Sequence, residues 1–178
     1  VIYSDSADKG ARFVELCNQK KIPLLFLQDV TGFMVGSRSE RGGIIKDGAK
    51  MVNAVANSVV PKITVFVGNS YGAGNYAMCG KAYGARFLFA WPSAAIAVMG
   101  GEQASRTLLA IQLKNRGEEV SEEEKKERLA DIQKRYADAM NPRYAAARLW
   151  VDAIIDPRRT REVVAQALAA CANNPEVP

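Results

Sequence analysis

The 178-residue chain contains no histidine. A serine or cysteine nucleophile normally needs a neighbouring base, usually histidine, so the common hydrolase triads cannot be built from this chain alone. The three cysteines, Cys17, Cys79 and Cys171, are far apart and lack metal-ligand spacing. Without histidine, a structural zinc site has few candidate ligands. We therefore expect no metal in this domain, and reduced thiols in an intracellular compartment.

Other features are missing as well. No run reaches the roughly 20 apolar residues of a membrane span, and no signal peptide is visible. Basic residues are scattered among acidic ones, so no basic stripe marks a nucleic-acid binder. The net charge of +5 is consistent with a phosphorylated ligand and equally with ordinary surface charge.

What the chain does contain is enough apolar sequence, 48% of its residues, for one globular domain. The composition becomes more charged from residue 116, so we expect residues 116–178 to be a helical extension of that domain. The sequence begins Val1-Ile-Tyr-Ser, without methionine and inside an apolar stretch. We expect residues 1–178 to be one domain of a longer, two-domain subunit.

The most informative stretch runs from Lys62 to Cys79. Residues 63–67 have the β-branched and aromatic composition of a buried strand. A turn with Gly68, Gly72 and Gly74 follows, and residues 75–79 are expected to start a helix. The first N–H groups of a helix have no internal partner, and glycine lets a ligand approach them closely. This turn is therefore predicted to be an oxyanion or anion site.

Several chemistries use such a turn. Residues 68–72 match the G-x-S-x-G nucleophile elbow around Ser70, which would need a lysine or a base from another chain. A nucleotide P-loop would need Gly-Lys-Ser/Thr, and a dinucleotide fingerprint would need glycine where Ala77 stands. A backbone cradle for a carbonyl or enolate oxygen needs no ionisable side chain. A plain packing turn between strand and helix remains the structural alternative.

Strand–turn–helix patterns recur along the chain and indicate a layered α/β fold. The apolar run 22–27 predicts a strand buried on both faces, followed by a glycine-rich loop to Gly43. The helix starting near Asp5 or Ser6 is expected to bury Phe13 and Leu16, and the helix over 44–57 to bury Ile45. Further elements are expected at 87–91, 95–99, 100–115, 121–140, 141–150 and from 156 onward.

A resemblance emerges from motifs that occur in order along the chain. They are Gly32-Phe-Met-Val-Gly36, Glu40, Gly43-Ile-Ile-Lys-Asp-Gly-Ala-Lys50, Val60-Pro-Lys62, Ser70-Tyr-Gly-Ala-Gly-Asn-Tyr76, Trp91-Pro92 and Val98-Met-Gly-Gly-Glu-Gln-Ala104. Together they resemble the C-terminal domain of the carboxyltransferase (β) subunit of biotin-dependent acyl-CoA carboxylases, most closely the 3-methylcrotonyl-CoA type. The resemblance implies the crotonase (ClpP-like) fold of stacked ββα units, with peripheral C-terminal helices.

The resemblance also implies an activity, which is carboxyl transfer from carboxybiotin to the α or γ carbon of an acyl-CoA. In that family the oxyanion donors fall on the N–H groups of Ala73 and Gly74, with Gly72 shaping the turn. The residues that would contact substrate are Tyr71 and Tyr76. The biotin pocket would include Thr31, Gly32, Phe33, Gly43, Ile44 and Ile45.

The implied partners are a biotin carboxyl carrier domain, a biotin carboxylase subunit and an amino-terminal carboxyltransferase domain, which holds most of the acyl-CoA. A homo-oligomer, hexameric in this family, is expected in the bacterial cytoplasm or the mitochondrial matrix. Three alternatives stay open: the decarboxylase subunit of a sodium-pumping complex, a noncatalytic assembly domain, and a single-domain enoyl-CoA hydratase or isomerase.

Overall fold

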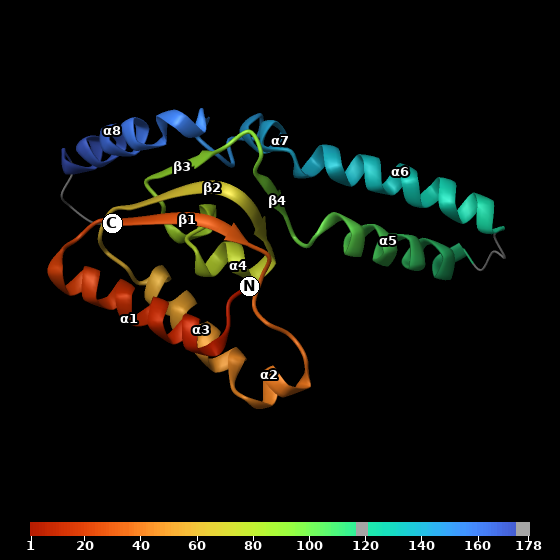
Figure 1. Cartoon of the computed structure of the whole chain (residues 1–178), viewed down its shortest axis with the longest axis horizontal. Helices are drawn as coiled ribbons and strands as arrows, with labels where there is room; N and C mark the ends of the chain where they lie inside the picture. Colours follow the sequence, from red (N-terminus) through yellow and green to blue (C-terminus); the bar gives the residue numbers. More distant parts are fainter. Residues whose placement is uncertain (117–120, 174–178) are drawn as a thin grey trace.

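The computed structural model describes residues 1–116 and 121–173 (Figure 1). Within this part of the chain the strands form one five-stranded sheet. Four strands lie side by side in the order β1 (Leu24–Val30), β2 (Lys62–Tyr71), β3 (Phe87–Ala90) and β5 (Ala153–Ile154). The short strand β4 (Ala95–Ala97) pairs with the last residues of β2, and all these pairs are parallel. The long strand β2 is therefore the centre of the sheet.

Helices cover both faces of this sheet (Figure 1). On one side α1 (Ser4–Lys20) and α3 (Ile44–Ala56) pack against each other, and their inner residues form one core with β1. On the other side α8 (Thr160–Ala172) packs Val164 and Ala167 against Ile63 and Val65 of β2. Apolar helix faces on both sides of a parallel sheet are typical of α/β proteins. The predicted layered fold is confirmed.

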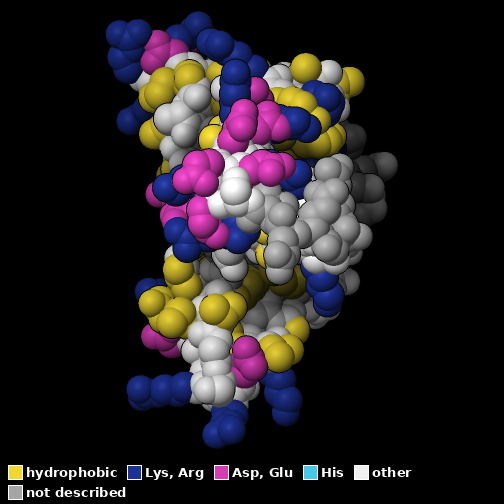
Figure 2. Space-filling view, turned by 90° about the vertical axis from the view of Figure 1, so that its right-hand side faces the viewer, with side chains coloured by type: hydrophobic (Ala, Val, Ile, Leu, Met, Phe, Trp, Pro, Cys, Tyr) yellow, Lys and Arg dark blue, Asp and Glu magenta, His cyan; other side chains and the backbone are white. Residues whose placement is uncertain are grey.

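The helices α5 (Gly101–Arg116) and α6 (Glu122–Met140) contact each other and extend away from the sheet (Figure 1). The hydroxyl of Ser121 accepts a hydrogen bond from the N–H of Glu124, so Ser121 is the N-cap of α6. Figure 2 looks from the side toward which this pair projects, and shows hydrophobic side chains in the upper and the lower part of the view with charged side chains between them. The remaining short elements are α2 (Ser37–Arg41), α4 (Gly72–Ala77), η1 (Lys81–Tyr83), α7 (Pro142–Ala146) and η2 (Pro157–Arg159).

Some expectations about burial are wrong. Strand β1 alternates between buried and exposed residues, and Leu25 and Leu27 remain 45% and 52% exposed. The reason is that β1 is the edge strand and only its α1–α3 side is packed. Phe13 is 61% exposed and Ile45 is 73% exposed, although both were expected to be inside. Apolar spacing alone does not say which side of a helix meets the sheet.

The helix boundaries also differ slightly from expectation. Helix α1 begins at Ser4 with Tyr3 as its N-cap, so neither Asp5 nor Ser6 caps it. Instead the Ser6 hydroxyl accepts a hydrogen bond from the N–H of Tyr3 at 2.8 Å. The expected loop from Gln28 to Gly43 is shorter, because β1 continues to Val30 and α2 forms inside it.

Candidate functional site

The site is organised around the junction of β2 and α4. The strand continues through Tyr71 and the helix begins at Gly72, so Gly68 lies in the strand and not in the turn. A Cβ on Gly68 would lie 2.5 Å from Oδ1 of Asp29, and a Cβ on Gly72 would lie 2.9 Å from the carbonyl oxygen of Val98. Gly72 also has φ +51°. Both positions need glycine because other atoms approach the backbone closely.

In the part of the chain that the structure describes, no side chain caps the first amides of α4. Tyr71 is the N-cap residue of this helix. The N–H groups of Ala73 and Gly74 are too near its start for a partner inside it. Among the described residues, no hydrogen bond outside helices and strands has either group as donor. A Cβ on Gly74 would lie 2.8 Å from Cγ2 of Val30, so Gly74 is packed while Ala73 is exposed.

A buried hydrogen-bond network holds this junction in place. The Ser70 hydroxyl donates to Oε1 of Gln28 at 2.6 Å, and Nδ2 of Asn75 donates to Oγ of Ser70 at 2.8 Å. Nε2 of Gln28 donates to the carbonyl of Met78 at 2.6 Å. Ser70 and Gln28 are fully buried. Ser70 therefore braces the strand from within, which argues against its acting as a hydrolase nucleophile.

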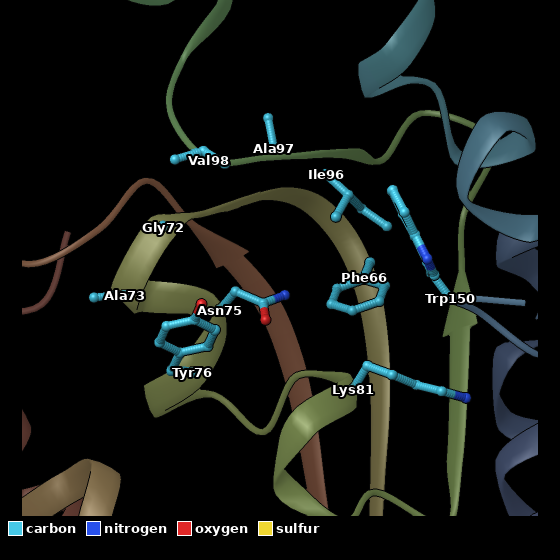
Figure 3. Close-up of a pocket in the computed structure, with 10 residues that line it drawn as sticks. All are labelled: Phe66, Gly72, Ala73, Asn75, Tyr76, Lys81, Ile96, Ala97, Val98 and Trp150. Carbon is cyan, nitrogen blue, oxygen red and sulfur yellow. The ribbon is translucent and has the colours of Figure 1, made fainter. Parts of the chain in front are cut away.

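A cavity of about 430 Å³ opens in front of α4 (Figure 3). Figure 3 shows the residues of α4 on one side, Trp150 on the opposite side and Ile96 to Val98 along a third edge. The described residues that line it are Phe66, Gly72, Ala73, Asn75, Tyr76, Lys81, Ile96, Ala97, Val98 and Trp150. We call it the β4 cavity. Its walls are largely apolar, and none of these described residues carries a carboxylate.

A second cavity, of about 670 Å³, shares Ala73 with the first. Its lining is Phe33, Met34, Val35, Glu40, Ile44, Ile45, Gly48, Ala49, Val52, Asn53, Ala56, Ala73 and Tyr83. We call it the α3 cavity. A Cβ on Gly48 would lie 2.8 Å from Cε1 of Phe33, so this helical glycine makes room for the Phe33 ring. This close contact accounts for a glycine inside α3.

The residues proposed for biotin binding are only partly brought together. Phe33, Ile44 and Ile45 line the α3 cavity. Gly43 is the N-cap of α3, directly before Ile44, and has φ +102°. The carbonyl of Gly32 accepts a hydrogen bond from the N–H of Ile2, and Thr31 is exposed but lines neither cavity.

The two tyrosines proposed for substrate binding lie differently. Tyr76 lines the β4 cavity and is half-exposed. Tyr71 is buried, and its hydroxyl donates to Oδ1 of Asn69 at 2.7 Å. Burial, with the nearby Tyr136 and Asp29, raises the pKa of Tyr71. Tyr71 lines neither cavity, so its buried ring contributes to the packing of the β2–α4 junction and not to a cavity wall.

Sequence reasoning did not identify Trp150, Lys81 or residues 96–98 as part of the site. Trp150 is nearly 80 residues from α4 in the sequence, and no motif marked it. The available signal for residues 96–98 was the apolar strand expected at 95–99. Since β4 pairs with the end of β2, it had to pass beside the start of α4.

The titratable groups nearby are engaged elsewhere. Nζ of Lys62 donates to the carbonyls of Val55 and Ser58, at 3.0 and 2.9 Å, and burial lowers the pKa of Lys62. Nζ of Lys81 lies 3.9 Å from Oδ1 of Asp152.

Within residues 1–116 and 121–173, no group of three or more acidic, cysteine or histidine side chains is placed to hold a metal. In the same residues, no helix has the length and apolar content to span a bilayer. Main-chain amides beside apolar walls are thus the groups with which this site can stabilise a negatively charged oxygen atom.

Comparison with known proteins gives consistent matches. The family profile described as carboxyl transferase domain matches residues 1–178. The "Biotin-dependent 3-methylcrotonyl-coenzyme A carboxylase beta1 subunit" of Mycobacterium tuberculosis is 56% identical, over 98% of this chain and 34% of its own length. The "Probable methylcrotonoyl-CoA carboxylase beta chain, mitochondrial" of Drosophila melanogaster is 53% identical, over 98% of this chain and 31% of its own length.

Solved structures agree with these relatives. The β subunit of geranyl-CoA carboxylase from P. aeruginosa superposes with a TM-score of 0.87 at 43% identity, over 99% of this chain and 33% of that one. The transcarboxylase 12S structure, described as a hexamer assembly, superposes with a TM-score of 0.85 at 41% identity, over 96% of this chain and 32% of that one. The chain thus spans about a third of the length of the proteins that it matches.

Proposed function

This chain belongs to the carboxyl transferase domain family, and on that premise we propose that it forms the biotin-side half of an acyl-CoA carboxyltransferase. The proposed reaction moves a carboxyl group from carboxybiotin to the α or γ carbon of a short acyl-CoA such as 3-methylcrotonyl-CoA. The family membership and the crotonase-type α/β fold expected from the motifs are both confirmed.

One observation carries the proposed mechanism: the amides of Ala73 and Gly74 begin α4, neither donates a described hydrogen bond outside helices and strands, and Ala73 lines both cavities. Carboxyl transfer places negative charge on oxygen atoms, first as the carboxyl group leaves its donor and then at the acyl thioester. Residue Ala73 lines both cavities, and we assign its amide as a donor to such an oxygen. Gly74 lines neither cavity, and we assign its amide as the second donor because it follows Ala73 at the start of α4. Gly72 allows the chain to turn tightly from β2 into these two residues.

The α3 cavity suits biotin. Phe33, Ile44 and Ile45 give it apolar walls that a bound ligand would cover and so shield from water, while Asn53 and Glu40 add polar groups to its lining. Exclusion of water strengthens a hydrogen bond from Ala73 to a charged oxygen. When bound, biotin would supply the carboxyl group and, in the mechanism implied by the family, also take up the proton from the substrate. No titrating side chain of this chain is then required, which fits the absence of histidine.

The assembly follows from the same premise. Relatives are named biotin-dependent or methylcrotonoyl-CoA carboxylase β chains, and this chain spans a third of their length. We assign residues 1–178 to one domain of a two-domain subunit, with residues 116–178 as its helical extension. The partners would be an amino-terminal carboxyltransferase domain, a biotin carrier domain and a biotin carboxylase, in a hexamer. The compartment would be the bacterial cytoplasm or, as for the relatives named mitochondrial, the matrix.

The test removes one amide without filling packed space. Gly74→Pro is unsuitable, because even a Cβ at Gly74 would lie 2.8 Å from Val30. Ala73→Pro removes the exposed N–H, and Ala73→Val adds similar bulk while keeping it. In the full-length subunit with its carrier, we expect Ala73→Pro to lower kcat by about 100- to 1,000-fold. Ala73→Val should lose far less. Equal activity of the two variants would reject the oxyanion role and support a noncatalytic assembly domain.

A further inference from the structure

We propose that the β4 cavity receives the hydrocarbon part of the acyl group, and that Trp150 determines how large that group can be. This inference rests on the proposed function. It assigns to the helical extension a direct role in substrate choice, whereas the family motifs point only to α4 and the loops before α3.

The first argument comes from the arrangement of the two cavities. Carboxyl transfer needs two reactants whose reacting atoms are held close together. The structure has two separate cavities, and the residue that lines both is Ala73, at the start of α4. If biotin occupies the α3 cavity, the β4 cavity remains for the acyl group, and the reacting carbon then lies at the junction.

The second argument comes from the chemistry of the lining. Phe66, Ile96 and Val98 give the β4 cavity apolar walls, and Tyr76 adds a half-exposed ring. Among the described lining residues the charged one is Lys81, and its ammonium group lies 3.9 Å from the carboxylate of Asp152. Such a lining favours an uncharged, branched or unsaturated hydrocarbon group. The cavity volume of about 430 Å³ leaves room for more than the smallest acyl groups.

The third argument comes from the way Trp150 is held. Its neighbour Leu149 has φ +57°, a backbone conformation that is sterically disfavoured for leucine. The N–H of Trp150 donates to the carbonyl of Ala145 at 2.9 Å. The ring of Tyr144 meets the Trp150 ring edge-on, with centroids 5.9 Å apart. The turn after α7 thus fixes a bulky ring that is still 47% exposed at the cavity wall. A fixed wall restricts the size of a ligand better than a mobile one does.

The test compares two acyl-CoA substrates in the full-length subunit with its carboxylated carrier. The five-carbon probe is 3-methylcrotonyl-CoA and the ten-carbon probe is geranyl-CoA. We expect Trp150→Ala to raise the ratio of kcat/KM for the longer over the shorter probe by at least about 10-fold. Trp150→Phe, which keeps a ring, should give a smaller shift in the same direction. Phe13→Ala is the matched control, since Phe13 is an exposed aromatic residue that lines neither cavity.

A second measurement separates the two cavities. Decarboxylation of the carboxylated carrier without any acyl-CoA should proceed equally in wild type and Trp150→Ala, because the α3 cavity is unchanged. The inference is wrong if the substrate ratio of both Trp150 variants stays within twofold of that of Phe13→Ala. It is also wrong if Trp150→Phe slows both probes and the carrier reaction to the same extent. Wild-type protein that carboxylates neither probe would instead overturn the proposed function, and this inference with it.

Discussion

Two glycines inside helices allow a sharp test of the packing around the α3 cavity. Gly10 lies in α1 and Gly48 lies in α3. Replacing a glycine by alanine within a helix stabilises the helix by about 1 kcal/mol. The two sites therefore share the same intrinsic gain and differ in what the new methyl group meets.

At Gly10 the added Cβ would lie 3.1 Å from Cε and Sδ of Met51, the flexible end of a long side chain. At Gly48 it would lie 2.8 Å from Cε1 and 3.1 Å from Cδ1 of Phe33, a rigid ring. Overpacking of this kind costs about 1–3 kcal/mol. We therefore expect Gly10→Ala to raise the free energy of unfolding by up to about 1 kcal/mol. For Gly48→Ala we expect a fall of about 0–2 kcal/mol, the overpacking cost less the helix gain.

Urea unfolding of both variants measures these changes. The double variant Gly48→Ala with Phe33→Leu supplies the control, since a smaller side chain at 33 should relieve the overlap and give a favourable coupling energy. The reasoning is refuted if Gly48→Ala stabilises the protein as much as Gly10→Ala does. Because Phe33 lines the α3 cavity, Gly48→Ala should also weaken the interaction with the biotinylated carrier, measured as a higher KM for the carrier.

Three further predictions concern the junction and its surroundings. Gly72→Ala should lower the free energy of unfolding by at least about 1–2 kcal/mol, because Gly72 has φ +51° and its Cβ would touch the Val98 carbonyl; thermal unfolding measures this, and an unchanged Tm contradicts it. A fluorophosphonate should not label Ser70 in the folded protein, and Ser70→Ala should cost about 1–3 kcal/mol by leaving Oε1 of Gln28 without the Ser70 donor. Mass spectrometry and urea unfolding report these two outcomes, and labelling at Ser70 would restore the hydrolase alternative. Burial raises the pKa of the Cys79 thiol from 9.0 to about 11, so the unfolded chain loses this proton first as the pH rises. The free energy of unfolding should fall between about pH 9 and pH 11 by at most about 3 kcal/mol, and more steeply than in Cys79→Ala. Equal pH dependence of the free energy of unfolding in the two proteins would refute this.

The sequence predicted local features well where their cause is local. Glycine at 72 and 74 signalled close approach of backbone, and Ser121 signalled a helix start, because turn geometry and capping depend on neighbouring residues. The apolar run at β2 was recognised as a strand, although its end was placed four residues early, at Val67. Pairing with β4 accounts for the extra length, since it adds a partner for Asn69 to Tyr71 that no local pattern reveals.

The sequence by itself determined the family, through motifs in a specific order, and the position of a helix start rich in glycine. Tertiary structure alone decided which side of β1 is buried, why Ile45 is exposed beside a cavity, and that Trp150 faces α4. The physical reason is that burial and cavity walls depend on contacts between segments far apart in the chain. A residue's own neighbours specify its backbone conformation, whereas the packing of the whole fold specifies what its side chain meets.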